Sequence, residues 1–271
     1  MQRSEDAFPT IQQSALLLLA SFLLQYVVAI ALYDYRRSIG LGEHELAALS
    51  MLLGNGLLLA TVLHFQRRNH RDLLHSATAS ALATTTLLVP PVLLLVPLIT
   101  LLDNSLITFL ERVFPLSRWE EEAFAHMVAG SVGAVVATCI LAPVLEEMLF
   151  RGVLLRSFLQ QHQRWHAISV SALFFGFAHL NIYQFVLAFW LGLFLGWLYE
   201  RSRSLIPCIA LHGALNSWVV LSAQGAQGQS DTNAEFSAIA WSASILAASL
   251  GAWLLRRFLI GSSSRAQKNA A

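Results

Sequence analysis

Long apolar stretches alternate with short polar segments along the whole chain. Several of these stretches reach about 18–20 residues, the length of helix that crosses the hydrocarbon core of a bilayer. Most are apolar all round a helical projection, which is typical of helices with no face in water. We therefore predict an all-α, polytopic membrane helical bundle of about eight transmembrane helices. The predicted spans lie near residues 14–33, 46–65, 77–102, 124–159, 166–180, 182–199, 205–223 and 236–260.

Composition supports a membrane protein. The chain has 271 residues, of which 56% are hydrophobic and 12% charged, whereas soluble domains carry about 25% charged residues. The net charge of +1, without a basic cluster, gives no indication of nucleic-acid binding, so the lipid bilayer is the expected partner. No internal repeat or domain boundary is visible. We predict one transmembrane domain over residues 1–271, with residues 261–271 as a disordered tail.

The arginines orient the predicted spans, because cytoplasmic loops are enriched in Lys and Arg. Clusters follow the second, fourth, sixth and eighth spans, and they comprise Arg67, Arg68 and Arg71; Arg151, Arg156 and Arg164; Arg201 and Arg203; and Arg256, Arg257, Arg265 and Lys268. Eight spans place all four clusters on one side, with both termini cytoplasmic and, in a bacterium, in the plasma membrane. Arg36 and Arg37 are the exception. The acidic segment 103–123 falls on the other side and has the spacing of an amphipathic interfacial helix.

Two adjacent carboxylates and an arginine stand at the end of the fourth apolar stretch: Glu146, Glu147 and Arg151. Ionisable groups are costly in a membrane and mark functional sites. Glu147 and Arg151 are four residues apart and lie on one helical face, so they can form an ion pair. Glu146 lies about 100° round the helix and is free for another role. Pro143 removes a backbone donor one turn earlier and is expected to bend the helix, which makes room for water.

Further polar residues lie in the later spans. His179 ends the fifth, and His212 and Asn216 are four residues apart in the seventh. A carboxylate and a histidine can deprotonate a water, while a second histidine and an amide can donate to a developing oxyanion. These groups suit hydrolysis of a peptide bond. Glu146, His179 and His212 could instead bind a divalent metal.

The depths of these groups are in tension. Counted from the ends of the spans, Glu146 is shallow and His179 is near the far end of its helix. At about 1.5 Å per residue, this would separate them too widely for a common site. Either the fourth helix continues to about Leu159, with Glu146 well below the surface, or the fifth span starts deeper than His166. We expect a polar cavity that opens to the cytoplasmic side.

Three motifs in order resemble the type II CAAX prenyl endopeptidase family, which belongs to the CAAX-protease and bacteriocin-processing intramembrane proteases. The motifs are Glu146-Glu147-x-x-x-Arg151, Phe175-x-x-x-His179 and His212-x-x-x-Asn216. The intervening Gly192-x-x-x-Gly196-x-x-Tyr199 segment is similar as well. The resemblance covers about 80 residues, from 142 to about 220. It implies that Glu147 and Arg151 support the site.

The resemblance also implies a catalytic role for each remaining motif residue. Glu146 would be the general base that activates water together with His179, and His212 and Asn216 would stabilise the oxyanion. The substrate would be a peptide or protein at the membrane, cleaved without a cofactor. A divalent metal such as zinc stays open as an alternative, although the sequence has no HExxH zinc motif.

Two other functions fit the same residues. A transporter or channel could use Glu146 and the histidines as a proton or cation relay, but inverted repeats that would support it are not evident. A non-catalytic membrane binding or immunity protein could carry the same motifs, because the resembling family includes members suspected of that role. Loss of cleavage on replacement of Glu146 or His179 would distinguish a peptidase from both.

Overall fold

The structure is a computed structural model that describes residues 7–36, 38, 40–118, 131–226 and 237–259. The described residues form a helical bundle, and the only β-type contact among them is an isolated bridge between His75 and Ser204. The helices are α1 (Ile11–Tyr33), α2 (Glu43–Phe65), α3 (His70–Leu74), α4 (Ala81–Leu93), α5 (Val96–Val113), α7 (Val132–Val136), the π-helical η1 (Ala137–Leu141), α8 (Ala142–Glu147), the π-helical η2 (Met148–Leu155), α9 (Arg156–Gln161), α10 (Arg164–Phe177), α11 (Ile182–Ser202), α12 (Ile206–Ala226) and α13 (Ala238–Leu259).

The predicted all-α, polytopic membrane class is confirmed. Six helical runs in the described chain are long and apolar enough to cross a bilayer, and the bent pair α4–α5 makes up to seven. The predicted count of about eight includes α10, whose 14 residues reach only about 21 Å. This is too short to cross the 30 Å hydrocarbon core, and α10 accordingly ends in the middle of the bundle, at the His179 motif. The tail 261–271 and residues 119–123 of the acidic segment lie outside the described residues.

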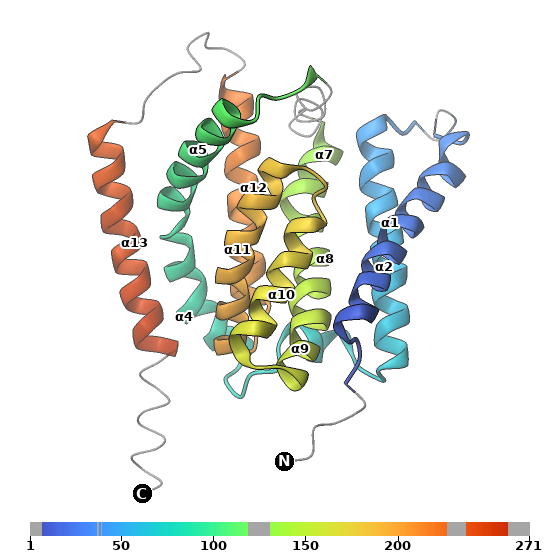
Figure 1. The fold of residues 1–271 in the computed structure, drawn as a ribbon, viewed down its shortest axis with the longest axis horizontal. Helices are drawn as coiled ribbons and strands as arrows, with labels where there is room; N and C mark the ends of the chain where they lie inside the picture. Colours follow the sequence, from blue (N-terminus) through green and yellow to red (C-terminus); the bar gives the residue numbers. More distant parts are fainter. Residues whose placement is uncertain (1–6, 37, 39, 119–130, 227–236, 260–271) are drawn as a thin grey trace, which may run out of the picture.

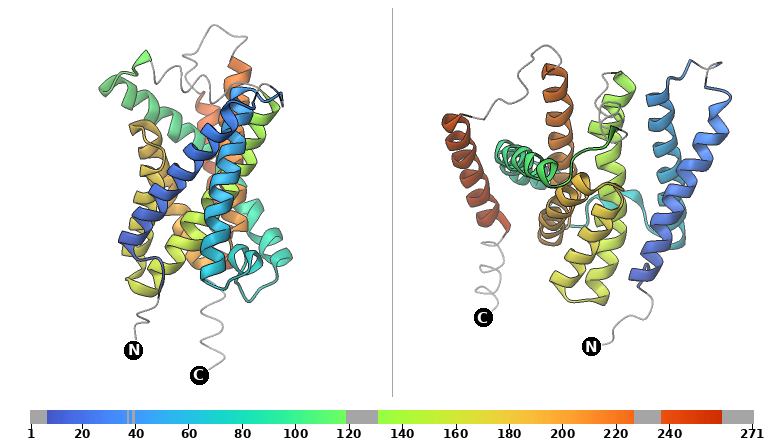
Figure 2. Two further views of the ribbon diagram at one scale, coloured as in Figure 1. Left: turned by 90° about the vertical axis from the view of Figure 1, so that its right-hand side faces the viewer. Right: turned by 45° about the horizontal axis from the view of Figure 1, so that its top comes forward.

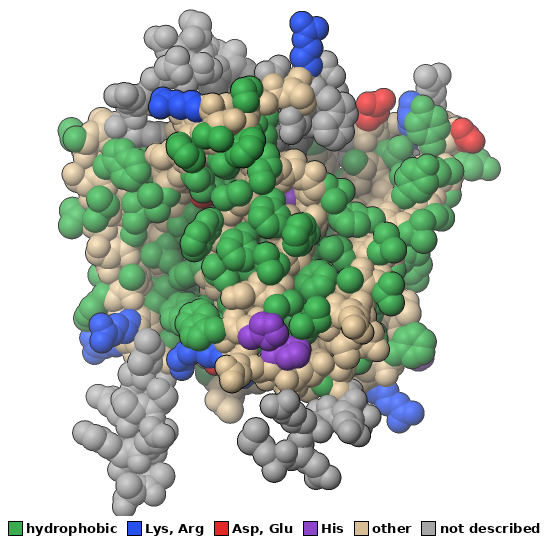
Figure 3. Space-filling view, viewed as in Figure 1, with side chains coloured by type: hydrophobic (Ala, Val, Ile, Leu, Met, Phe, Trp, Pro, Cys, Tyr) green, Lys and Arg blue, Asp and Glu red, His purple; other side chains and the backbone are tan. Residues whose placement is uncertain are grey.

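On the face shown in Figure 3, apolar side chains cover the middle of the bundle, and charged side chains gather towards its two ends. The 18-residue window of α1 has a mean hydropathy of 2.4, yet only 6% of it is buried within the protein. Its exposed apolar side chains, such as Leu19 and Leu23, therefore need lipid around them.

α1 begins and α13 ends at the same end of the bundle (Figure 1). The helices that precede the described arginine clusters also end there; we call it the basic end. Arg151 is the exception to the predicted clusters, because it lies inside the long run Val132–Gln161 and is fully buried. It is an interior residue of the fourth span, not a loop cation.

The α1–α2 hairpin lies at one edge of the bundle and α13 at the opposite edge, with the motif helices between them (Figures 1 and 2). Polar side chains join the hairpin: the Ser21 hydroxyl and the Gln25 amide both donate to Asn55 Oδ1, at 2.5 and 3.3 Å. Hydrogen bonds of this kind hold helices together in lipid. Gly54 permits the approach, because a Cβ there would lie 2.8 Å from the Gln25 backbone nitrogen.

α4 and α5 form one span that is bent by 43°. Pro90 and Pro91 lie inside α4, and Pro97 lies in the first turn of α5. Because proline lacks an N–H and disfavours helical geometry in the residue before it, the helix breaks ahead of Pro97 and restarts. The predicted amphipathic segment is the second half of α5, up to Val113.

α10 and α11 pack closely side by side through glycines. A Cβ at Gly192 would meet the Ala172 Cα at 3.0 Å, and one at Gly196 would meet the Ile168 Cγ2 at 3.0 Å. The Gly-x-x-x-Gly spacing is thus a packing feature, as such small residues are in membrane helices. This contact fixes α10, and therefore the His179 motif at its end, against α11.

Candidate active site

The two glutamates lie halfway along one long helical run. Val132–Gln161 spans 30 residues, and Glu146 is 15 residues from its end at the basic end, or about 22 Å. α10 starts at Arg164, and Phe177 lies 13 residues further on, or about 20 Å from that end. Glu146 and the start of the His179 turn are therefore at similar depths. The first of the two predicted solutions is the one observed: the fourth helix continues past the motif.

Glu147 is the acceptor at the centre of the site. Its Oε1 accepts a hydrogen bond from Arg151 Nη1 at 2.9 Å and lies 2.9 Å from His212 Nδ1. The side chains of Glu147 and Arg151 are 0% and 1% exposed. Arg151 Nη2 also donates to the Gly192 carbonyl at 3.4 Å, and its guanidinium lies 4.2 Å from the Phe175 ring centroid. The ion pair predicted from the spacing is present, and His212 joins it.

The hydrogen bond to Glu147 fixes the proton on His212. A carboxylate only accepts, so Nδ1 carries the hydrogen and Nε2 is directed elsewhere. That Nε2 lies 3.9 Å from Glu146 Oε2, which is buried and has no hydrogen-bond partner among the described residues. The side chain of Glu146 is 26% exposed. Beside His212, Glu146 thus keeps an oxygen that has no hydrogen-bond partner among the described residues.

His179 is held by its own helix turn. Its Nδ1 lies 2.9 Å from the Phe175 carbonyl oxygen, and since a carbonyl only accepts, Nδ1 is the protonated nitrogen and Nε2 is left as an acceptor. The Phe175 ring contacts both histidines edge-on, with centroid distances of 5.2 Å to His179 and 5.6 Å to His212. The two predicted histidines therefore lie around one buried aromatic ring.

Asn216 joins α12 to the wide turn η1. Its Nδ2 donates to the Thr138 carbonyl at 2.9 Å. In η1 the Ala142 N–H bonds the Ala137 carbonyl, five residues back. In that register the donor for Thr138 would be residue 143, a proline with no N–H. The Asn216 amide supplies the missing hydrogen bond, and its predicted role in oxyanion stabilisation stays a prediction that concerns its second N–H.

Gly213 allows this contact. A Cβ at Gly213 would lie 2.9 Å from the Cys139 carbonyl oxygen and 3.9 Å from the Pro143 ring. Pro143 removes a backbone donor before the glutamates, and α12 approaches this turn closely. The bend and the room for water that Pro143 was expected to create stay predictions. Turns of π-helix recur at functional sites, and here they lie on both sides of the helix α8 that carries the glutamates.

Within the described residues, no three His, Cys, Asp or Glu side chains are arranged to hold a metal ion. The alternative ligand set of Glu146, His179 and His212 is not gathered around one point in this conformation. The Glu147 oxygen nearest His212 is already bonded to Arg151. The divalent-metal alternative therefore stays a prediction, and we derive no step through a metal.

Sequence reasoning missed two participants. Phe175 was noted only as a motif residue, but its ring contacts both histidines and the Arg151 guanidinium. Thr138 carried no signal of its own, except that it stands five residues before a proline. The contact between Glu147 and His212 was also not predicted, because the spacing accounts only for the bond to Arg151.

Comparison with known proteins identifies the central segment. Residues 128–218 match the family described as type II CAAX prenyl endopeptidase Rce1-like. A protein of Bacillus subtilis (strain 168), named "Putative membrane peptidase YdiL", is 24% identical over 111 residues, which cover 40% of this chain and 46% of that protein. The match therefore spans less than half of that relative's length. No solved structure is matched. The segment 128–218, with all three motifs, thus carries the predicted similarity to the type II CAAX prenyl endopeptidases.

Proposed function

We propose that this protein is an intramembrane endopeptidase that hydrolyses a peptide bond with a water activated by Glu146 and His179. The observation that carries the proposal is the free, buried Oε2 of Glu146, 3.9 Å from His212 Nε2 and inside a membrane bundle. An unpaired carboxylate oxygen at such a place is costly unless it serves a function. The family match and the peptidase name of the B. subtilis relative support this chemistry.

The general base is Glu146 together with His179. Glu146 offers a carboxylate oxygen, and His179 offers Nε2 because its Nδ1–H is donated to the Phe175 carbonyl. A water that donates one hydrogen to each acceptor is oriented and loses a proton to Glu146 as its oxygen attacks the peptide carbonyl. General-base catalysis of this kind contributes about 10²–10⁴-fold.

The oxyanion donor is His212. Because its Nδ1–H is donated to Glu147, Nε2 can donate only when the ring is an imidazolium. The second N–H of Asn216, one helical turn away, is the further donor.

Collapse of the tetrahedral intermediate completes the reaction. The carbon–nitrogen bond breaks, and the proton that Glu146 took from the water passes to the leaving amine. The products are a carboxylic acid and an amine, which become a carboxylate and an ammonium when the acid gives its proton to the amine, and Glu146 returns to its ionised form. Glu147 and Arg151 do not react in this scheme; they hold His212 in the tautomer that faces Glu146.

We further propose that the substrate is a peptide at the membrane face and that the basic end of the bundle is cytoplasmic. The arginine distribution supports this orientation, which places both termini in the cytoplasm and, in a bacterium, the protein in the plasma membrane. The family description names prenylated CAAX substrates. A prenylated peptide ending in C-a-a-X and its unprenylated counterpart are therefore the substrates to compare.

The test is cleavage of these peptides by the purified protein and its Glu146→Gln variant. We expect a loss of at least 100-fold for Glu146→Gln, while Glu111→Gln, the same substitution on exposed α5, keeps full activity. Equal cleavage by wild type and Glu146→Gln would refute the catalytic assignment. Loss of activity on chelation, restored by zinc, would refute the metal-free reaction.

A further inference from the structure

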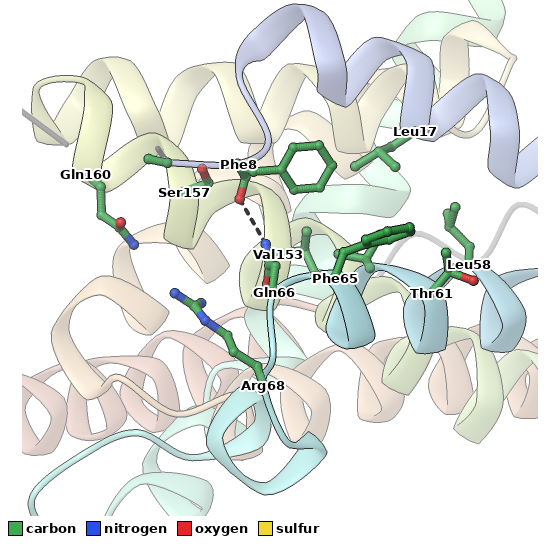
Figure 4. Close-up of a pocket in the computed structure, with 12 residues that line it drawn as sticks. Phe8, Leu17, Leu58, Thr61, Phe65, Gln66, Arg68, Val153, Ser157 and Gln160 are labelled. Carbon is green, nitrogen blue, oxygen red and sulfur yellow. Dashed lines mark hydrogen bonds between the residues drawn. The ribbon is translucent and has the colours of Figure 1, made fainter. Parts of the chain in front are cut away.

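A cavity opens at the basic end, away from the proposed catalytic residues, none of which lines it. Its volume is about 680 Å³, within the range of ordinary ligand sites. It lies between the N-terminal segment, the end of α2 and the η2–α9 stretch, and its lining residues are shown in Figure 4. The proposed peptidase function assigns it no role.

The cavity has an apolar part along the membrane spans. Its walls include Leu17 of α1, Leu58 and Phe65 of α2, and Val153 of η2. Leu58 lies seven residues before Phe65, so this wall extends about 10 Å along α2, from the basic end towards the middle of the bundle. Such a wall suits a hydrocarbon chain lying parallel to the helices.

The other part of the cavity is polar and ends at Arg68. The Gln66 amide donates to the Phe8 carbonyl at 2.9 Å and the Ser157 hydroxyl to the Pro9 carbonyl at 2.9 Å, so both hold the N-terminal segment in place. The Arg68 side chain, by contrast, has no hydrogen bond or ion pair among the described residues. In Figure 4 its guanidinium extends towards the side chain of Gln160 across open space.

Other arginines act electrostatically on the same region. The charges of Arg68, Arg156 and Arg203 all act on the fully buried Tyr199, whose hydroxyl has no partner among the described residues. Asp72 is the one acid that acts on Arg68. Burial lowers the pKa of Arg68, and the like charge of Arg156 lowers it further. Arg156 donates to the backbone carbonyl of Asp72, not to its carboxylate. Arg68, Arg156 and Arg203 thus outnumber the single acid Asp72, and an anion would be attracted there.

We infer that this cavity binds an anionic phospholipid, with its phosphate on Arg68 and an acyl chain between α1 and α2. The order of the two parts carries the inference, because the cationic group lies at the bundle end and the apolar walls run inward, as headgroup and chain do in a leaflet. Basic pockets beside transmembrane helices bind anionic headgroups in this way. A prenylated C-a-a-X peptide also carries a carboxylate and a hydrocarbon chain, so displacement of the lipid by a peptide is one outcome of the test.

The test is native mass spectrometry of the full-length protein in detergent with phosphatidylglycerol, phosphatidylcholine or inorganic phosphate. We expect phosphatidylglycerol to bind most tightly, and Arg68→Gln to weaken it about five- to tenfold. The matched control is Arg67→Gln, which removes the same charge from the neighbouring exposed position and should change the affinity less than twofold. Arg68→Lys keeps the charge and should retain most of the binding.

Several outcomes would overturn the inference. Equal binding of phosphatidylglycerol and phosphatidylcholine, or equal losses in the two glutamine variants, would show that no headgroup is recognised at Arg68. Binding of inorganic phosphate as tight as that of phosphatidylglycerol would show that the cavity holds an anion but has no site for an acyl chain. Displacement of the bound lipid by a peptide that the protein cleaves would show that the cavity binds the peptide substrate and not a lipid. Thermal unfolding without lipid checks that each variant is folded.

Discussion

The buried triad of Arg151, Glu147 and His212 makes a prediction in which stability and activity separate. Glu147→Leu removes the acceptor of two 2.9 Å contacts and leaves the Arg151 guanidinium buried without a counter-charge. Removing one partner of a buried ion pair costs about 3–5 kcal/mol. We therefore expect Glu147→Leu to lower the free energy of unfolding by that amount, measured by denaturant titration in detergent micelles.

The double variant Glu147→Leu/Arg151→Met then tests the cause. Without the guanidinium no uncompensated charge remains, and replacing a buried pair by apolar residues is often neutral or stabilising. We expect the double variant to recover most of the lost stability, with a coupling energy above about 2 kcal/mol. Its peptide cleavage should stay low, because His212 still lacks the acceptor that fixes its tautomer.

Two results would refute this reasoning. The cycle also needs the single variant Arg151→Met. If the losses of the two single variants sum to the loss of the double variant within about 0.5 kcal/mol, Glu147 and Arg151 do not act as a pair. Full cleavage activity in the recovered double variant would show that His212 needs no orienting carboxylate. The two measurements are independent, so either part can fail alone.

Three further predictions concern the contacts around the site. Gly213→Ala should lower the free energy of unfolding by about 1–3 kcal/mol and reduce cleavage, because its Cβ would lie 2.9 Å from the Cys139 carbonyl oxygen. The control Gly56→Ala has open space around it and should be neutral or stabilising by up to about 1 kcal/mol. Equal effects of the two substitutions would contradict the close approach at Gly213. Asn216→Ala should lower the free energy of unfolding by about 1 kcal/mol or more, because it leaves the part-buried Thr138 carbonyl unpaired, and an unchanged value would show that another donor replaces it. Phe175→Leu should cost up to about 2 kcal/mol through loss of its contact with Arg151 and should lower kcat; an unchanged kcat would show that its ring does not position the histidines.

The sequence predicted best what depends on spacing within one helix. Hydrophobic length gave the membrane class, and the four-residue separation gave the Glu147–Arg151 pair. The depth of Glu146 was ambiguous because Arg151 was counted as a loop residue. A buried arginine next to a carboxylate has the same local sequence as an arginine that ends a span, and only the packing against Phe175 distinguishes them.

Contacts between helices could be predicted only in outline. The motifs indicated that His179 and His212 approach Glu146, and the structure describes a 3.9 Å contact for His212. The shared Phe175 ring depends on the angle between α10 and α12, which no periodicity encodes. The predicted span near residues 166–180 agrees closely with α10, Arg164–Phe177, whose 14 residues are fewer than a bilayer crossing needs.

The π-helical turns η1 and η2 bear on how related chains should be aligned. A π turn closes its hydrogen bond over five residues where an α turn uses four, so it absorbs an extra residue without rotating the helix beyond it. A relative could lose one residue from either turn and still present its two glutamates to the same neighbouring helix. Single-residue gaps on either side of the glutamate pair are thus compatible with an unchanged site, and distance along the chain is a poor measure of which residues face it.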